Sequence, residues 1–480
     1  MRSKLQIKPY TPAEIAGITG GTLSGGRADA PVTSVCTDSR EVAPGALFCA
    51  IPGERTDGHK YMKTAADAGA VCILAQHLPE EDLGDGCAVV VVPDTIEAIC
   101  TLAAEYRRES RARVIAVTGS VGKTTTKEFI AAVSSAAFRT HKTEGNHNNN
   151  LGLSMTLFTL SPEDEVSVLE MGMSDLGEIQ QMSRIAQPDI AVVTNIGTSH
   201  LASLGTRENI CRAKLEIVAG MKADGILLLN GDEPLLTERA PSLVPAPQFV
   251  SVAGHLGKYR AVNIRSMEGG MLFDLIAQSS AVTNVRIPTL GRHNVYNALF
   301  AYAVGTELGM TDEDIRRGLL LFEGADMRQN IYPLGKITVI EDCYNASPES
   351  MRAALDVLAA VAARQGGHAA ALLGDMLELG DYTRLMHHQL GQYAAQTKVQ
   401  KLFCYGMMAD IVAEAAIKKG IRADNVYVAL DTRDAQVMAD MVLTALHPGD
   451  VLLVKASRAV QAERIIECMK KRRQKKTGRK

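Results

Sequence analysis

Residues 114–138 read VIAVTGSVGKTTTKEFIAAVSSAAF, and this stretch decides the fold class of the chain. Residues 114–117 are apolar, as in a buried strand, and two glycines follow closely. Beyond them, the spacing of Phe129, Ile130 and Val133 places these side chains on one face of a helix. A buried strand that passes through a short glycine-containing loop into a helix predicts an α/β fold with a mostly parallel sheet.

The loop TGSVGKTTT, residues 118–126, has the chemistry of a phosphate-binding site. Glycines let backbone N–H groups turn inward, and a helix N-terminus adds a partial positive charge. Lys123 would reach the β- and γ-phosphates of ATP, and the Thr124 hydroxyl would coordinate Mg²⁺. The predicted ATP-binding residues here are Thr118, Gly119, Ser120, Val121, Gly122, Lys123, Thr124 and Thr125.

The loop departs from the longer form of this pattern, in which Val117 would be glycine. It is therefore a shorter G-x-x-G-K-T-T variant, and an ordinary strand–helix turn is the alternative interpretation. A phosphate loop alone does not distinguish a kinase from an ATPase or a ligase. The residues that follow must decide.

The alternation of strand and helix patterns continues along the chain and predicts three α/β domains. We expect a first domain over residues 1–107, a central P-loop domain over 108–325 and a Rossmann-like C-terminal domain over 326–480. Ligands of open α/β sheets bind at the carboxyl ends of the strands. Further strands are predicted at 166–172, 190–197, 225–232, 337–345, 369–376, 401–406, 426–430 and 451–458.

Composition favours a globular cytoplasmic protein. Apolar residues make up 46% and charged residues 22% of the chain. No apolar run approaches the ~18 residues that span a bilayer, so no membrane insertion is expected. The nine cysteines form no C-x-x-C pair, which argues against a zinc site or a disulfide frame. The basic tail over 470–480 is predicted to be disordered, without a nucleic-acid function, and the chain to be a monomer.

Four polar segments follow predicted strands of the central domain. GNHNNNLG (145–152) offers Asn148 and Asn149 beside the loop, and EMG (170–172) places Glu170 where a carboxylate can hold Mg²⁺. TNIGTSHL (194–201) contains His200, and AKLEI (213–217) contains Lys214. Taken singly, the histidine would more often be structural and the lysine a solvated helix residue. A purely structural role is harder to accept for a buried carboxylate such as Glu170, because burying an unpaired charge costs free energy.

Together and in this order, these segments and GRHNVYNAL (291–299) resemble the motifs of the Mur ligase family, amide-forming enzymes of peptidoglycan precursor synthesis. The resemblance implies that Thr124 and Glu170 bind one Mg²⁺ and that His200 helps to bind a second. It implies that Lys214 is carbamylated, so that a cation becomes a carboxylate-like group that can face Mg²⁺. The implied catalytic residues are Lys123, Glu170, His200 and Lys214, and further nucleotide contacts are Asn297, Arg328 and Asp342.

The first domain resembles that of the family members that add the third amino acid or the terminal dipeptide, and the third domain resembles that of the dipeptide-adding members. TDSREVAPGALFCAIPGERTDGHKYMKTAADAGA (37–70) resembles a UDP-sugar-binding domain, in which Ser39 and Arg40 would contact uridine or pyrophosphate; a surface turn is the alternative. DCYNASPESMRAAL (342–355) is similar to the D-x-Y-N-A-N-P-x-S-M signature of those members, with a serine for the second Asn. KASR (455–458) replaces the more usual KGSR.

The resemblance implies an ATP- and Mg²⁺-dependent ligase that joins D-alanyl-D-alanine to UDP-N-acetylmuramoyl-tripeptide through an acyl phosphate. His387 is a candidate base for the incoming amine, and a positioning role is equally compatible with its motif. Two alternatives stay open: a related ligase that adds another amino acid or peptide, and a nucleotide-dependent regulatory scaffold.

Overall fold

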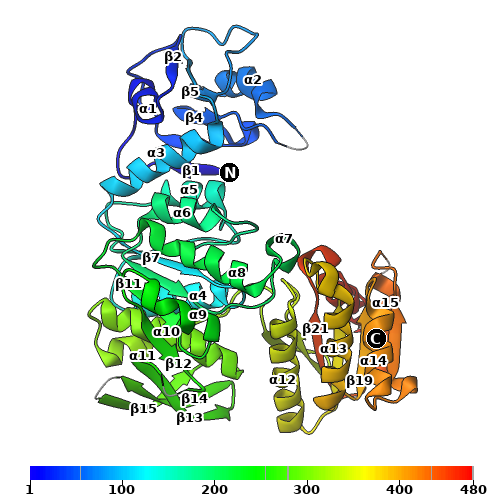
Figure 1. Cartoon of the computed structure of the whole chain (residues 1–480). Helices are drawn as coiled ribbons and strands as arrows, with labels where there is room; N and C mark the ends of the chain where they lie inside the picture. Colours follow the sequence, from blue (N-terminus) through cyan, green and yellow to red (C-terminus); the bar gives the residue numbers. More distant parts are fainter. Residues whose placement is uncertain (54–55, 255, 278–279, 434, 478–480) are drawn as a thin grey trace.

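The computed structural model describes residues 1–53, 56–254, 256–277, 280–433 and 435–477. Three sheets build it, one for each of three units along the chain (Figure 1). The first unit stands above the second, and the third lies beside the second (Figure 1). The predicted fold class, three α/β units with mostly parallel sheets, is confirmed. The boundaries at 107 and 325 stay predictions.

The first sheet has the strand order β1-β3-β4-β5-β6-β2, with parallel inner strands and antiparallel edges. Its strands are β1 (Arg2–Lys4), β2 (Thr22–Ser24), β3 (Ser34–Cys36), β4 (Ala46–Cys49), β5 (Ala70–Ala75) and β6 (Ala88–Val91). Its helices are α1 (Pro12–Thr19), α2 (Met62–Asp67) and α3 (Thr95–Glu109).

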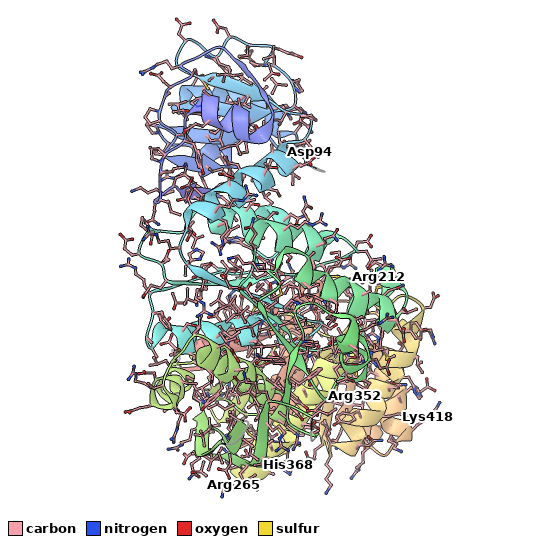
Figure 2. All side chains as sticks on the ribbon, turned by 60° about the vertical axis from the view of Figure 1, so that its left-hand side comes forward. Asp94, Arg212, Arg265, Arg352, His368 and Lys418 are labelled. Carbon is pink, nitrogen blue, oxygen red and sulfur yellow. The ribbon has the colours of Figure 1, made fainter. Side chains whose placement is uncertain are left out.

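Helix α3 joins the first unit to the second. Asp94 begins it by accepting hydrogen bonds from the N–H groups of Ile96 and Glu97 (Figure 2). Near its end, the Tyr106 hydroxyl accepts from the N–H of Ile7 and donates to the carbonyl of Leu160. One apolar cluster runs through both units, so they pack as one body around this helix.

The second sheet has the order β15-β14-β13-β12-β11-β10-β7-β9-β8. Its strands are β7 (Arg113–Thr118), β8 (Thr140–Lys142), β9 (Val166–Glu170), β10 (Ile190–Val193), β11 (Ile226–Asn230), β12 (Gln248–Ser251), β13 (Tyr259–Met267), β14 (Gly270–Ala277) and β15 (Ser280–Ile287). Its helices are α4 (Lys123–Ser135), α5 (Asn150–Leu157), α6 (Glu178–Ala186), α7 (Leu201–Leu204), α8 (Arg207–Leu215), α9 (Pro234–Arg239), α10 (Arg292–Glu307) and α11 (Asp312–Leu320).

Strand β7 lies between β9 and β10, and all three are parallel. Its residues Val114 to Val117 are fully buried, which explains their continuous apolar character. Val117 is opposite Glu170 on β9, and Thr118 is opposite Val193 on β10. The loop after β7 therefore lies between the loops after its two neighbours. The antiparallel meander β13–β15 extends this sheet and was not predicted.

The third sheet has the order β16-β17-β21-β18-β19-β20, parallel except for the edge strand β16. Its strands are β16 (Asn330–Leu334), β17 (Ile337–Glu341), β18 (Ala369–Gly374), β19 (Lys401–Tyr405), β20 (Val426–Ala429) and β21 (Val451–Lys455). Its helices are α12 (Pro348–Gln365), α13 (Thr383–Gln396), α14 (Ala409–Lys418), α15 (Ala435–Ala445) and α16 (Glu463–Thr477).

Helix α16 extends into the basic tail, where the sequence predicted disorder. Its buried Met469 anchors the helix, the Lys470 ammonium lies 4.8 Å from the ring centre of Tyr332, and Arg472 pairs with Asp440 at 2.6 Å. These contacts hold the first part of the basic tail in the helix, which ends at Thr477. The end of the predicted tail, 478–480, lies outside the described residues.

All nine cysteines are free thiols, and eight of them are buried. Cys468 on α16 is partly exposed. Burial raises the pKa of the Cys87 thiol to about 11 and that of Cys343 to about 12. No helix in the described parts of the chain is long and apolar enough to cross a bilayer.

Candidate active site

The loop between β7 and α4 has the backbone of a phosphate-binding loop. Gly119 has φ +146° and Gly122 has φ +85°, both in the region that favours glycine. A Cβ on Gly119 would lie 1.9 Å from Thr194 Oγ1, so only glycine fits there. The Thr118 hydroxyl donates to the carbonyl of Met171 and fastens the start of the loop to the segment after β9.

Asn195, which the sequence reasoning did not single out, holds this loop from the neighbouring strand. Its backbone carbonyl accepts from the Ser120 N–H at 3.0 Å, and its side chain accepts from the Val121 N–H at 3.0 Å. The Asn195 side chain also donates to the Val121 carbonyl. The Ser120 hydroxyl is buried without a partner in the described structure. The loop is thus fixed on one side and keeps an unused polar group.

Lys123 is the first residue of α4, and its ammonium donates to the carbonyl of Gly119 at 2.9 Å. Burial lowers the pKa of Lys123, while the Glu170 carboxylate raises it. The hydrogen bond to Gly119 folds the ammonium back over its own loop. A lysine in this position can neutralise phosphate oxygens that enter the loop.

Glu170 ends strand β9 and is 2% exposed. One of its oxygens accepts from Asn148 Nδ2 at 2.9 Å, and the other is buried with no donor among the described residues. A buried carboxylate oxygen without a donor suits a hard cation such as Mg²⁺, and Thr124, the second residue of α4, is buried as well. The donors present fit the predicted metal site.

A cavity of about 1360 Å³ lies between the second and third units and contains most of the predicted site. The predicted residues that line it are Ser120, Val121, Gly122, Lys123, Thr124, Thr125, Asn148, Asn149, Glu170, His200, Asn297, Arg328 and Asp342. The predicted residues outside its lining are Ser39, Arg40, Thr118, Gly119 and Lys214.

Lys214 lies on α8, outside the cavity lining, and is 1% exposed. No hydrogen bond or ion pair joins its ammonium to the described residues. Burial lowers its pKa well below the usual value, and the charge of Lys123 lowers it further. The alternative of a solvated helix residue does not hold, because this lysine is fully enclosed.

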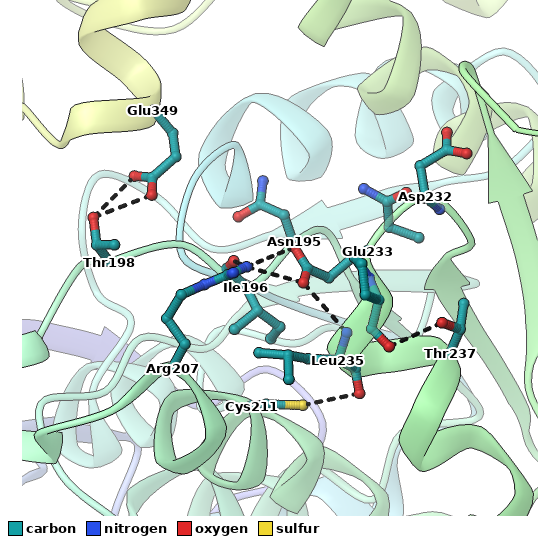
Figure 3. A network of polar contacts seen from close by, with 12 residues as sticks. Asn195, Ile196, Thr198, Arg207, Cys211, Asp232, Glu233, Leu235, Thr237 and Glu349 are labelled. Carbon is teal, nitrogen blue, oxygen red and sulfur yellow. Dashed lines mark hydrogen bonds and ion pairs between the residues drawn. The ribbon is translucent and has the colours of Figure 1, made fainter.

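The third unit closes the cavity through contacts with the segment after β10. His200 Nδ1 lies 2.8 Å from Glu378 Oε2, and the Ala202 N–H donates to the carbonyl of Glu378. Thr198 donates to the Glu349 carboxylate at 3.1 Å (Figure 3). The short helix α7 within this segment faces the third unit (Figure 1). His200 therefore sits where the two units meet.

Residues that were predicted to contact the nucleotide come from three further places around the cavity. Asn297 on α10 accepts from the Thr126 hydroxyl, directly behind the phosphate loop. The Arg328 guanidinium lies 4.2 Å from the ring centre of Tyr344. Asp342 pairs with the buried Lys455 at 2.7 Å. The cavity can thus hold a nucleotide between the phosphate loop and a cation–aromatic stack.

Comparison with known proteins agrees with this geometry. Three family models match the chain. The first, described as the catalytic domain of the Mur ligase family, matches residues 31–117. The Mur ligase middle domain matches residues 117–305, and the Mur ligase glutamate ligase domain matches residues 327–458. The UDP-N-acetylmuramoyl-tripeptide--D-alanyl-D-alanine ligase of Bacillus subtilis is 38% identical over 95% of this chain and 97% of its own. The chain belongs to the Mur ligase family.

Other relatives of this Mur ligase carry the same name. The Escherichia coli protein named as that ligase is 32% identical over 96% of this chain and 98% of its own. A crystal structure of MurF from Acinetobacter baumannii superposes with a TM-score of 0.87 at 32% identity, over 97% of this chain and 99% of that one. MurF from Thermotoga maritima in complex with ADP has a TM-score of 0.81 at 28% identity, over 92% and 98%.

Two predicted substrate residues of this Mur ligase lie far from the cavity. Ser39 and Arg40 belong to a short 3₁₀ turn of the first unit. The Arg40 guanidinium forms a forked pair with the Asp38 carboxylate, at 2.9 and 2.6 Å. The Arg40 side chain is 87% exposed, so its guanidinium group is accessible from solvent. The uridine-binding role of these residues stays a prediction.

His387 of the Mur ligase is a structural residue rather than a base. Its Nδ1 donates to the carbonyl of Thr383 at 2.7 Å, and its Nε2 accepts from the Met376 N–H at 2.9 Å. The ring is fully buried, and burial lowers its pKa. With both nitrogens engaged and the ring outside the cavity lining, it holds the loop after β18 in place.

Proposed function

We propose that this Mur ligase joins D-alanyl-D-alanine to the terminal carboxylate of UDP-N-acetylmuramoyl-tripeptide with hydrolysis of ATP to ADP and phosphate. The observation that carries the proposal is full-length similarity, at 30–38% identity, to eight proteins that bear this activity in their names. The cavity supports it, since the phosphate loop and the third unit face one space.

The chemistry requires activation because a carboxylate is a poor acyl donor. A carboxylate oxygen of the tripeptide attacks the γ-phosphorus of ATP, the bond to the bridging oxygen breaks, and ADP leaves. The dipeptide amine then attacks the carbonyl carbon of the acyl phosphate, loses a proton and expels inorganic phosphate. Positioning and charge neutralisation are the main tasks of the protein in both steps.

Lys123 would offset the negative charge of the transferring phosphoryl group, and Asn195 would hold the loop that carries it. Thr124 and Glu170 would hold one Mg²⁺, and His200 would help to hold another. When bound, Mg²⁺ supplies Lewis-acid neutralisation of the phosphate oxygens. Asn297, Arg328 and Asp342 would keep the nucleotide in the cavity.

Lys214 would act as its carbamate. An amine adds CO₂ only when it is unprotonated, and the enclosure of Lys214 favours that form. Carbamylation would form an N–C bond to CO₂ with loss of a proton, and it would place near Lys123 an anion that can face Mg²⁺. The prediction is that Lys214→Ala loses activity and that Lys214→Glu, or added formate, restores part of it.

The first unit would bind the UDP end of the substrate through Ser39 and Arg40. We propose that the enzyme works in the cytoplasm, where its nine unpaired thiols stay reduced, and that it acts as a monomer.

A phosphate-release assay tests the proposed function. Release should require ATP, the UDP-muramoyl-tripeptide and D-alanyl-D-alanine together, with lysine- and diaminopimelate-containing tripeptides run side by side. A regulatory scaffold would hydrolyse or exchange nucleotide without either co-substrate. A ligase for another acceptor would release phosphate with a different amino acid or dipeptide from a panel.

A further inference from the structure

Lys127 is a buried lysine on α4 with two polar partners. It follows Lys123 by about one turn of the helix and is 1% exposed. Its ammonium donates to the carbonyl of Thr143 at 2.6 Å and pairs with the Glu128 carboxylate at 2.7 Å. A buried ammonium is destabilising unless it is paired and hydrogen-bonded. The two contacts therefore keep this charge at a fixed place behind the phosphate loop.

The Glu128 carboxylate is shared by two lysines. Its second oxygen accepts from the ammonium of Lys142, the last residue of β8, at 2.7 Å. Burial raises the pKa of the Glu128 carboxyl, but the hydrogen bonds from both lysines lower it, and the pKa lies below its usual value overall. The carboxylate is therefore charged at neutral pH. If either lysine were replaced, it would keep the other as its partner.

Thr143 carries the contact from Lys127 to Glu170. It is fully buried directly after β8, and its N–H donates to the carbonyl of Val168 on β9 at 3.0 Å. Its hydroxyl oxygen accepts from the Glu170 N–H, also at 3.0 Å. The threonine thus binds the end of β9 through two of its atoms, while Lys127 holds its carbonyl from α4. The main chain of Glu170 is fastened to the helix through this residue.

The same threonine begins the segment that leads to Asn148. The Asn148 side chain donates to the Glu170 carboxylate at 2.9 Å, and its carbonyl accepts from the Gly172 N–H at 2.7 Å. Only four residues separate Thr143 from Asn148. The backbone position of Glu170 and the orientation of its carboxylate therefore both depend on a segment whose start is held by Lys127.

We propose that Lys127 is a positioning residue for the metal site at Glu170. It does not line the cavity, and it acts through Thr143 rather than by touching the carboxylate. The inference rests on the proposed function, in which Glu170 holds Mg²⁺, and adds the group that places this ligand. Residues that orient metal ligands typically contribute 10- to 100-fold to metal affinity, about the effect expected here.

Lys127→Met separates positioning from folding. Methionine is a flexible apolar side chain that can occupy the space of the lysine stem. Removing one member of a buried ion pair is strongly destabilising when the other charge is left alone, but Glu128 keeps Lys142. The variant should therefore fold, and its Thr143 carbonyl should lose the donor from α4. Lys142→Met is the matched control, because it removes the other ammonium from the same carboxylate and leaves the contact to Thr143 intact.

Hydrogen exchange in the protein treated with a chelator tests the link without metal. In Lys127→Met the Glu170 amide should exchange at least about tenfold faster than in wild type, because its acceptor is no longer held in place. In Lys142→Met its rate should match wild type. Mass spectrometry with fragmentation of the peptide over residues 166–172 gives the rate at this amide. Equal rates in the two methionine variants would overturn the proposal.

Binding of Mn²⁺ in the presence of ADP, followed by electron paramagnetic resonance, tests the consequence for the metal site. Mn²⁺ favours the same oxygen ligands as Mg²⁺. Its Kd should rise about tenfold or more in Lys127→Met and keep the wild-type value in Lys142→Met. A wild-type Kd in Lys127→Met would overturn the positioning role.

Thr143→Val and Thr143→Ser test the same route from its other end. The valine variant removes the hydroxyl that holds Glu170 and should raise both the exchange rate and the Kd; the serine variant keeps the hydroxyl and should stay close to wild type. If Lys127→Met fails to fold, wild-type values in Thr143→Val still overturn the proposal. A wild-type protein that binds no Mn²⁺ would contradict the proposed function instead, while the exchange rates, measured without metal, decide separately on Lys127.

Discussion

Asn148 and Glu170 share a hydrogen bond of 2.9 Å, and this contact leaves the second Glu170 oxygen buried with no donor among the described residues. The amide orients the carboxylate without neutralising it. A buried carboxylate that keeps a free oxygen is destabilising unless a cation completes it. The pair therefore supports a metal-binding role for Glu170 more strongly than its position at a strand end does.

Glu170→Gln should lower kcat by about 100- to 1000-fold and shift the Mg²⁺ dependence to higher concentration, because the amide carries no net charge. Asn148→Ala, which removes only the orienting group, should have a smaller effect on both. Steady-state assays over a Mg²⁺ titration measure the difference. An unchanged Mg²⁺ dependence in Glu170→Gln would contradict the assignment.

Lys214→Met should abolish activity and stabilise the fold. The pKa of Lys214 is lowered in the folded state. At pH values between the folded-state pKa and the unfolded-state pKa of about 10.4, the unfolded chain therefore binds more protons than the folded one. Protonation favours unfolding in this pH range. The stabilisation by methionine should be full below the folded pKa and vanish as pH rises to about 10.4. Melting temperatures should rise by about 2–4 °C for each kcal/mol gained, measured in CO₂-free buffer. A lower melting temperature at neutral pH would contradict the burial argument.

Gly119→Ala should destabilise the protein by about 1–3 kcal/mol and weaken ATP binding, since the new methyl group would meet Thr194 at a positive φ. Gly17→Ala is the control: it lies in α1, has nothing within 4 Å of the added Cβ, and should be neutral or stabilising by about 0.5–1 kcal/mol. Urea unfolding compares the two. Equal stability of both variants would show that the loop relaxes around the methyl group.

Stability should fall as pH decreases below about 6.5. Burial lowers the pKa of His141, His293 and His387 in the folded state, so the unfolded state binds more protons between the folded pKa values and about 6.5. His387→Gln should reduce the slope by up to one proton, about 1.4 kcal/mol per pH unit. Unfolding curves from pH 8 to pH 5.5 measure it. A flat profile in the wild-type protein would contradict the lowered pKa values of these rings.

The sequence predicted the central strand–loop–helix because local pattern and long-range packing agree there. Residues 114–117 are apolar and fully buried, and the two glycines have the positive φ that their loop requires. Glu170 and His200 could be placed near the loop because parallel neighbouring strands end at one edge. The order of the motifs along the sequence was therefore sufficient to predict this part of the site.

Other features depend on contacts that a sequence does not display. Asn195 was within a quoted motif, yet its threefold hold on Ser120 and Val121 follows from the pairing of β7 with β10. Glu349 and Glu378 contact the segment after β10 only because the third unit lies beside the second. The helical start of the basic tail likewise depends on Tyr332 and Asp440, which are distant in sequence.

The distribution of thiols has a practical consequence. Eight cysteines are enclosed, and Cys468 on α16 is the one with partial exposure, so a maleimide dye should react there first without any engineering of the chain. A dye on the third unit, combined with a nucleotide analogue that carries an acceptor fluorophore, would report the distance across the cavity during turnover. The native protein thus provides its own attachment point for following the approach of the two units by energy transfer.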